Sequence, residues 1–289
     1  MELQGTQKGI VAYQGRPGAN SELACIKALP DWQRVSCSSF ADAFAMVTSG
    51  KANIAMIPIE NSTAGRVADI HLLLPESGLH IAGEYFLPIH HQMVAPKGSK
   101  LEDIKTVYSH EQALSQCRKT LHSMGIEGRV SSDTAAAAEW IALQKPPHCA
   151  ALAGALAARQ YELEVLVEDM NDYHDNTTRF VILSNQEHYP EAQGKAMMTS
   201  LLFELSSIPA ALYKALGGFA TNGINLTKLE SYVTPPSFEH AQFYVDVEGH
   251  INEKRMHNAL AELGFFSKKV VILGSYPADE FRYVHKQVT

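Results

Sequence analysis

Between residues 8 and 185 one plan repeats along the chain: a short apolar run, a polar turn, and then an amphipathic or alanine-rich stretch. "GIVAYQG" (9–15) precedes "RPGANSELACIKAL" (16–29), where Pro17 and Gly18 favour a turn. The plan returns at 53–74, 106–125, 129–144 and 148–162. Repeated strand–turn–helix units predict a parallel α/β sheet, in which the loops at the strand ends form a ligand crevice.

The last apolar run of this region, "TRFVILS" (178–184), has no helix of its own after it. A strand that runs against its neighbours presents its beginning, rather than its end, at the crevice. The overlapping segment "NTTRF" (176–180) places two threonines and an arginine at that beginning. The pattern therefore predicts two α/β lobes, with this strand returning across a hinge near residues 168–176.

After a polar stretch with proline and glycine, the pattern changes. We expect residues 188–196 to be a linker between domains. The following residues predict strands and helices in the order βαββαβ, which is the ferredoxin-like arrangement; the strands are expected at 197–206, 224–233, 241–249 and 268–277, and the helices at 209–223 and 252–264. Such a sheet leaves edge strands that often pair between subunits.

Charge and composition exclude several classes of protein. The 289-residue chain has a formal net charge of −7, and no lysine/arginine cluster is longer than "KK", which argues against nucleic acid or an anionic membrane as partner. The longest run of small apolar residues (149–158) is shorter than the ~20 residues that span a bilayer. The N-terminal residues contain no apolar segment of the kind found in secretory signals, so we expect a cytoplasmic protein.

Metal and disulfide chemistry are also not expected. The four cysteines are widely spaced and form no CxxC pair, which is typical of reduced, buried thiols in a cytoplasmic protein; they are Cys25, Cys37, Cys117 and Cys149. The thirteen histidines include an adjacent pair at 90–91, but no HExxH motif and no Cys/His spacing suited to zinc.

Six motifs occur in order along the chain: "YQGRPGANS" (13–21), "PIENSTAG" (58–65), "SHEQALSQC" (109–117), "SSDTAAAA" (131–138), "NTTRF" (176–180) and "GINLTKLES" (223–231). With them the chain resembles monofunctional prephenate dehydratases, which have a catalytic domain followed by a regulatory ACT domain. The resemblance covers residues 8 to about 280. It implies a catalytic domain over 1–187, an ACT domain over 197–280 and a tail over 281–289. Only about eight residues precede the first expected strand, so we expect no chorismate mutase segment before it.

The resemblance carries expectations about fold and activity. The fold would be α/β, with two lobes like those of type 2 periplasmic binding proteins and a ferredoxin-like ACT domain. The activity would be the decarboxylating dehydration of prephenate to phenylpyruvate in phenylalanine biosynthesis, without a cofactor or metal. The protein would be a cytoplasmic homodimer or homotetramer inhibited by L-phenylalanine. Aromatisation drives the reaction, so the enzyme must only hold a dianion and help hydroxide to leave.

In this family the threonine before Arg-Phe has the catalytic role, which maps to Thr178. A hydroxyl in a water-poor cleft can donate a hydrogen bond, or relay a proton, to the departing oxygen. Arg179 would grip a substrate carboxylate with its planar fork, and Phe180 would lie beside the substrate. Without the resemblance, Thr178 would be a β-former at a strand start and Arg179 a surface charge. Thr177 is assigned to turn formation.

Further crevice residues are expected on four loops. Glu60, Asn61 and Ser62 would hydrogen-bond the substrate, with capping of the next helix by Asn61 or Ser62 as the alternative. Gly15 would form the turn or let the backbone approach the ligand. The remaining candidates open expected helices, where they would contact an anion or act as caps; they are Ser109, His110 and Gln112 on one helix, with Ser109 as a candidate N-cap, and Thr134, beside Ser132 and Asp133, on another.

The family's phenylalanine site lies at a subunit interface of the ACT domain, and the matching residues are Ala210, Ala211, Leu212, Asn225, Leu226, Glu230 and Ser231. The chain departs from the family pattern twice: Pro-Ala-Ala-Leu stands where Gly-Ala-Leu is typical, and "ESYVTPP" (230–236) stands where Glu-Ser-Arg-Pro is typical. A domain that serves dimerisation alone is the alternative. Two other readings of the whole chain remain open, an arogenate dehydratase with the same chemistry and a non-catalytic sensor of an amino acid.

Overall fold

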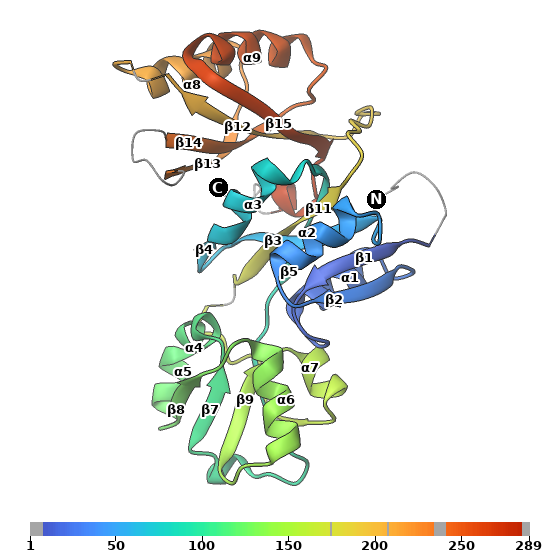
Figure 1. The fold of residues 1–289 in the computed structure, drawn as a ribbon. Helices are drawn as coiled ribbons and strands as arrows, with labels where there is room; N and C mark the ends of the chain where they lie inside the picture. The colour runs from blue at the N-terminus through green and yellow to red at the C-terminus, as the bar shows by residue number, and fades with distance from the viewer. Residues whose placement is uncertain (1–7, 174, 207, 234–240, 285–289) are drawn as a thin grey trace. The chain divides into compact units, whose positions relative to one another are not determined.

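A computed structural model describes residues 8–173, 175–206, 208–233 and 241–284 of the chain. Contacts divide it into two units. One unit contains Met1–Val67 and Phe86–Phe180, and the other contains Ala68–Tyr85 and Val181–Thr289. The division runs through two strands, β5 (His80–Pro88) and β11 (Thr177–Ser184). Figure 1 labels the elements.

The first sheet has the strand order β2-β1-β3-β11-β5, with the short β4 paired to β3. Its remaining strands are β1 (Ile10–Gln14), β2 (Gln33–Cys37), β3 (Ile54–Asn61) and β4 (Gly65–Arg66). The helices α1 (Asn20–Ala28) and α2 (Phe40–Thr48) connect the first three strands. The predicted strands β1 and β3 pair in parallel as expected, and β2, which the sequence pattern did not single out, is parallel to β1. The connection after β3 leads instead through β4 to α3 (Ala68–Ser77).

The second sheet has the order β10-β6-β9-β7-β8. It consists of β6 (Gln92–Ala95), β7 (Thr106–Ser109), β8 (Glu127–Val130), β9 (Cys149–Ala153) and β10 (Glu164–Val167). β7 pairs in parallel with β8 and β9, but β6 is antiparallel to both β9 and β10. The predicted parallel pairing is confirmed for β7, β8 and β9, and β6 makes the sheet mixed. β6 follows β5 after three residues, and an antiparallel neighbour needs no helical crossover.

Alternation along β9 explains how helices cover both faces of this sheet. Ala150 and Leu152 join a core with Cys117 and Leu121, whereas the opposite face packs against α6 and α7 through small side chains. The helices are a short 3₁₀ turn η1 (Leu101–Asp103), α4 (Glu111–Gln116), α5 (Arg118–Ser123), α6 (Thr134–Gln144) and α7 (Ala155–Gln160). Alanines on α6 and β9 allow a close approach of helix and sheet.

The helix predicted after β7 differs from the structure in two ways. The single helix expected over 110–125 is two helices, α4 and α5, which meet at Cys117. His110, and not Ser109, is the N-cap of α4, because Ser109 is the last residue of β7 and donates its hydroxyl proton to the Leu152 carbonyl oxygen (2.7 Å). α1 begins at Asn20 after its N-cap Ala19, whose side chain makes no capping hydrogen bond. The predicted cap at Asp133 is confirmed, since its side chain accepts from the Ala136 amide.

The C-terminal residues form an antiparallel sheet of order β13-β14-β12-β15. Its elements are β12 (Met197–Leu205), α8 (Ala211–Thr221), β13 (Leu226–Val233), β14 (Ala241–Glu248), α9 (Lys254–Phe266) and β15 (Ser267–Pro277). This is the predicted βαββαβ order, and Figure 1 shows both helices on one face of the sheet. Leu201, Phe203, Val245 and Val247 pack there against residues of α8 and α9.

The same unit includes α3, the first part of β5 and a short final helix, α10 (Phe281–Val284). Arg282 on α10 forms a bidentate ion pair with the fully buried carboxylate of Glu84 on β5, with N–O distances of 2.6 and 2.8 Å. The Arg282 guanidinium also donates to the Thr227 hydroxyl on β13 (3.4 Å). Gly274 on β15 approaches the backbone of Ile81 so closely that a side chain there would collide with it.

Candidate active site

The end of β3 and the beginning of β11 are held together by backbone hydrogen bonds. The Ser62 amide donates to the Thr177 carbonyl oxygen (2.9 Å), and the Thr177 amide donates to the Ser62 hydroxyl (2.9 Å). The Ser62 hydroxyl in turn donates to the Asp175 carbonyl oxygen (2.7 Å). The segments "ENS" and "NTTRF" therefore lie side by side.

Asn61 fixes the hydrogen-bonding role of Thr178. Its Oδ1 accepts from the backbone amides of Thr63 (3.0 Å) and Ala64 (2.9 Å). Because backbone amides only donate, Oδ1 must be on that side and Nδ2 on the other. Nδ2 donates to Thr178 Oγ1 (3.0 Å) and to Asn176 Oδ1 (2.8 Å). The hydroxyl oxygen of Thr178 therefore accepts a hydrogen bond, and its proton can point toward a ligand. Asn61 makes this turn rather than capping a helix.

Three side chains that the sequence did not single out extend this arrangement. Asn176 Nδ2 donates to Gln116 Oε1 (2.9 Å), and Gln116 Nε2 donates to Thr63 Oγ1 (2.6 Å). Gln116 Oε1 also lies 2.8 Å from Nε2 of His91. Gln116 and Asn176 occur inside the motifs "SHEQALSQC" and "NTTRF", and His91 belongs to the histidine pair. The motifs contained the signal, but only the fold shows that these positions meet.

Arg179 lies in a different environment from Thr178. Its side chain is 1% exposed, and its Nη1 lies 3.0 Å from Oε1 of Glu60. Successive side chains on a strand point to opposite faces, so Glu60 with Arg179 and Asn61 with Thr178 form two pairs on opposite faces of the sheet. The contact of Arg179 with a substrate carboxylate stays a prediction; in the structure the guanidinium is already held by Glu60. Phe180 is buried in the core.

The other predicted crevice residues make no direct hydrogen bond to this cluster among the contacts described. Ser109 is fully buried, His110 accepts the Gln112 amide through Nδ1 (3.3 Å), and Gln112 is exposed on the first turn of α4. Thr134 is the first residue of α6 and is half-buried. Helix α4 thus contributes Gln116, at its last position, to the cluster.

Both glycines of the first motif have structural reasons to be glycine. Gly15 has φ +118° and accepts the Ser36 hydroxyl proton through its carbonyl oxygen (2.5 Å). Gly18 has φ +92°, and a Cβ there would lie 2.9 Å from Cα of Ala157 on α7. Positive φ favours glycine, and the close approach excludes a larger residue at Gly18. The turn and the packing on α7 therefore account for both residues.

The predicted effector residues lie in the C-terminal sheet and its first helix. Ala210 is the N-cap of α8 with φ +59°, and Ala211 and Leu212 form the first turn. Asn225 is exposed before β13, and its carbonyl oxygen accepts from the Glu248 amide (2.9 Å). Leu226, Glu230 and Ser231 are on β13, where Glu230 lies 3.5 Å from the Lys228 ammonium. Residues 234–236 of "ESYVTPP" are outside the described part of the chain.

Burial shifts the pKa of several groups near these elements. Burial lowers the pKa of His91, a shift that the hydrogen bond to Gln116 partly opposes and the neighbouring His90 reinforces. Burial raises the pKa of Cys117 and of Cys25 to about 12. All four cysteines are free thiols, three of them buried and Cys149 half-buried. Thiols with such pKa values are unreactive at neutral pH.

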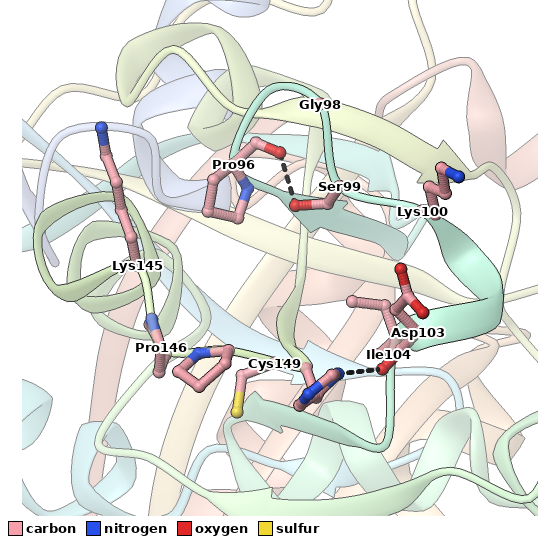
Figure 2. A pocket seen from close by; sticks show the side chains of 11 residues that line it. Pro96, Gly98, Ser99, Lys100, Asp103, Ile104, Lys145, Pro146 and Cys149 are labelled. Carbon is pink, nitrogen blue, oxygen red and sulfur yellow. Dashed lines mark hydrogen bonds between the residues drawn. The ribbon is translucent and has the colours of Figure 1, made fainter.

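A cavity of about 250 Å³ lies beside the starts of β7 and β9 in the second sheet, and Figure 2 shows the residues that line it. Lys100, Asp103 and Ile104, which precede β7, line it together with Pro146 and Cys149, which lie at the start of β9. Because β7 and β9 are parallel, this cavity is at the opposite end of the strands from Ser109. It is therefore separate from the cluster around Thr178.

Between residues 8 and 284, with the gaps stated above, no three His, Cys, Asp or Glu side chains gather as metal ligands would. No helix in the same part of the chain combines the length and the apolar character needed to cross a bilayer.

Comparison with known proteins gives consistent results. The prephenate dehydratase family pattern matches residues 11–188. A bifunctional N-acyl-homoserine lactone acylase/prephenate dehydratase from Komagataeibacter europaeus is 46% identical over 273 residues, which is 94% of this chain and 97% of the relative. Arogenate dehydratase 2 from Petunia hybrida is 41% identical over 93% of this chain and 72% of its own.

A solved structure supports the fold over nearly the whole chain. Prephenate dehydratase from Arthrobacter aurescens, crystallised in complex with L-Phe, has a TM-score of 0.85 and 32% identity over 96% of this chain and 98% of its own. The mixed α/β sheets followed by an antiparallel C-terminal sheet are therefore the fold of a prephenate dehydratase. The comparisons favour an enzyme over the alternative of a non-catalytic amino-acid sensor. This chain belongs to the prephenate dehydratase family and is a carbon–oxygen lyase of phenylalanine biosynthesis.

Proposed function

We propose that this chain converts prephenate to phenylpyruvate, with Thr178 as the group that meets the departing hydroxyl. As the ring carboxylate leaves as carbon dioxide, the electrons of its bond shift through the ring and expel the hydroxyl group, which takes up a proton and leaves as water. The Thr178 hydroxyl would donate its proton in a hydrogen bond to that oxygen. The Asn61 amide already donates a hydrogen bond to Thr178 Oγ1 and would stabilise negative charge on Oγ1 as the proton moves toward the departing oxygen.

The observation that carries this proposal is the fixed direction of the Asn61 amide. The two backbone amides of Thr63 and Ala64 hold Oδ1, so Thr178 Oγ1 receives an N–H and keeps its own proton for a ligand. A hydroxyl held in this way is already oriented to donate. Donors that are pre-organised in this way contribute strongly to stabilising a transition state.

The test compares two neighbouring threonines. Thr178→Ala should lower kcat about a hundredfold or more without loss of fold, because the donor to the leaving oxygen is removed. Thr177→Ala is the matched control and should keep kcat within about threefold, since the described bonds of Thr177 to Ser62 use its backbone. Steady-state kinetics with prephenate and circular dichroism give both results. Near-normal turnover by Thr178→Ala would falsify the assignment.

Other features of the proposal concern substrate and regulation. Glu60, Asn61, Ser62, Gly15, Ser109, His110, Gln112, Thr134 and Phe180 are proposed to shape the substrate site, and Arg179 to bind a substrate carboxylate. The domains are proposed as 1–187 and 197–280, joined by 188–196. We further propose a cytoplasmic homodimer or homotetramer, which the four free thiols and the edge strands favour. Light scattering on the purified protein distinguishes the two assemblies.

Arogenate is the alternative substrate, because the plant relatives include arogenate dehydratases. Parallel assays with prephenate and arogenate measure kcat/KM for each. A larger value for prephenate supports the proposed preference, and a larger value for arogenate reverses it. The relative from Komagataeibacter europaeus favours a second activity at 46% identity, so hydrolysis of an N-acyl-homoserine lactone should be assayed on the same preparation.

Feedback by L-phenylalanine is proposed at the residues around α8 and β13, including Ala210, Ala211, Leu212, Asn225, Leu226, Glu230 and Ser231. It is supported by a relative crystallised with L-Phe. Asn225→Ala should reduce inhibition of the dehydratase by phenylalanine at least tenfold while kcat stays within about twofold, because the exposed Asn225 side chain is remote in sequence from the Thr178 cluster. Equal inhibition curves for Asn225→Ala and wild type would rule out the proposed effector site.

A further inference from the structure

Around Thr178, the direction of every side-chain amide follows from a single backbone turn. Thr63 and Ala64 amides set Oδ1 of Asn61, so Nδ2 of Asn61 faces Oδ1 of Asn176. The Nδ2 of Asn176 must then face Oε1 of Gln116, and the Nε2 of Gln116 faces Thr63 Oγ1 and Asn61 Oδ1. Each amide has one donor end and one acceptor end, so reversing any one of them would place like ends together.

The same logic fixes the tautomer of His91. Gln116 Oε1 is an acceptor, and His91 Nε2 lies 2.8 Å from it, so the ring must carry its proton on Nε2. The other ring nitrogen, Nδ1, is buried and has no hydrogen-bond partner in the described part of the chain. A second proton there would place an unpartnered N–H in the interior.

His91 is also held rigidly by its own backbone. Its amide donates to Asn171 Oδ1 (2.7 Å), its carbonyl oxygen accepts from the Met170 amide (2.8 Å), and the residue is 3% exposed. Asn171 in turn donates to the Ile89 carbonyl oxygen (2.8 Å). Both anchors come from the chain segment that leads to β11. The imidazole is therefore fixed between Gln116 and the segment before Thr178.

We propose that His91 is a positioning residue that keeps the Gln116 amide, and through it Asn61 and the Thr178 hydroxyl, in the orientation needed for turnover. It does so as a neutral hydrogen-bond donor through Nε2 and does not exchange a proton with substrate. This inference rests on the proposed function of Thr178. The lowered pKa of His91, caused mainly by burial, agrees with a ring that stays neutral.

Kinetics of four variants test the proposal. His91→Phe removes the donor and should lower kcat about 10- to 100-fold, with KM within about threefold. His91→Gln can place an amide N–H near the position of Nε2 and should restore kcat to within about fivefold of wild type, with an unchanged pH profile between pH 6 and 9. His90→Phe is the matched control, because His90 is exposed and bonds to Asp169 instead, and should be within about twofold of wild type. Gln116→Glu keeps the acceptor for His91 but loses the donor to Thr63, and should lose kcat like His91→Phe.

A spectroscopic measurement covers the case in which His91→Phe fails to fold. Nitrogen-15 NMR of the wild-type imidazoles, with the His91 signal found by its loss in His91→Gln, should show a protonated Nε2 and an unprotonated Nδ1 from pH 6 to 9. A proton on Nδ1 at pH 7, wild-type kcat in His91→Phe, or a His91→Gln variant as slow as His91→Phe would overturn the proposal. If Thr178→Ala keeps its turnover, the proposed function fails instead, whatever the tautomer of His91.

Discussion

At the scale of single residues, the most informative finding is that Thr178 and Arg179 differ in their surroundings although they are adjacent. Thr178 is half-buried and receives an amide N–H, whereas Arg179 is buried against Glu60. A short motif therefore combines a group that can face a ligand with a group that ties two strands together. Two adjacent residues of one motif therefore have different structural roles.

This difference makes Arg179→Lys a sharp test. If the guanidinium binds a substrate carboxylate, replacing its fork by a point charge should raise KM about tenfold or more while kcat changes little. If it serves only Glu60, KM should stay within about twofold and the loss should appear in the free energy of unfolding. Steady-state kinetics and urea unfolding of the same preparation separate the two results, and an unchanged KM would remove Arg179 from the substrate site.

The sequence contained most of the cluster but not its connections. Glu60 and Asn61 were identifiable because polar residues at the end of an apolar run are unusual, whereas Thr178 was identifiable only through the resemblance to the family. Gln116 and His91 were not, because a glutamine late on a helix and a histidine in a loop have no local feature that distinguishes them from surface residues. Their role depends on contacts between segments 25 to 60 residues apart, which no local pattern encodes.

At the scale of secondary-structure elements, the elements that follow from a clear alternating or repeating pattern were predicted correctly. The boundaries of several elements were not. The βαββαβ order follows from clear periodicity and is confirmed. The cap of α4 is His110 and not Ser109, because the Ser109 hydroxyl bonds to Leu152 across the sheet. The single predicted helix is divided into α4 and α5 at Cys117. The strand β6, which spans four residues, was not predicted from the sequence.

The start of α8 supplies a prediction at this scale. Ala210 has φ +59°, a left-handed conformation that costs a non-glycine residue about 1 kcal/mol, and it stands where glycine is typical of the family. Ala210→Gly should therefore raise the free energy of unfolding by about 0.5–1 kcal/mol in urea titrations. Ala211→Gly, one residue further into the helix, is the control and should lower it by a similar amount. A lower free energy of unfolding in Ala210→Gly would show that the left-handed conformation of Ala210 is not strained.

At the scale of the whole molecule, the C-terminal helix α10 is tied to β5 by the ion pair between Arg282 and Glu84. Glu84 also accepts a hydrogen bond from the Asp279 amide (3.1 Å). The pKa of Asp279 is raised, mainly by burial and to a smaller extent by the negative charge of Glu84. Residues almost 200 positions apart thus share one buried polar centre. Disrupting this polar centre is expected to destabilise the unit that contains the C-terminal sheet and residues 68–85.

Arg282→Ala should lower the free energy of unfolding by about 3 kcal/mol, because removing one partner takes both guanidinium bonds from a buried carboxylate. Arg255→Ala provides the control, since its pair with Glu253 is exposed and should contribute less than about 1 kcal/mol. Urea unfolding monitored by fluorescence gives both values. Equal, small effects of the two substitutions would show that the buried pair adds nothing beyond an exposed one.

The close approach of Gly274 to Ile81 bears on the exchange of C-terminal domains between relatives. A C-terminal domain taken from another family member brings its own residue at the position of Gly274, and any side chain there would force β15 away from the backbone of β5. Grafts joined at the linker alone would therefore work only with donors that have glycine at this position. A safer graft would move residues 68–85 together with the C-terminal sheet, so that the two backbones that touch come from the same parent.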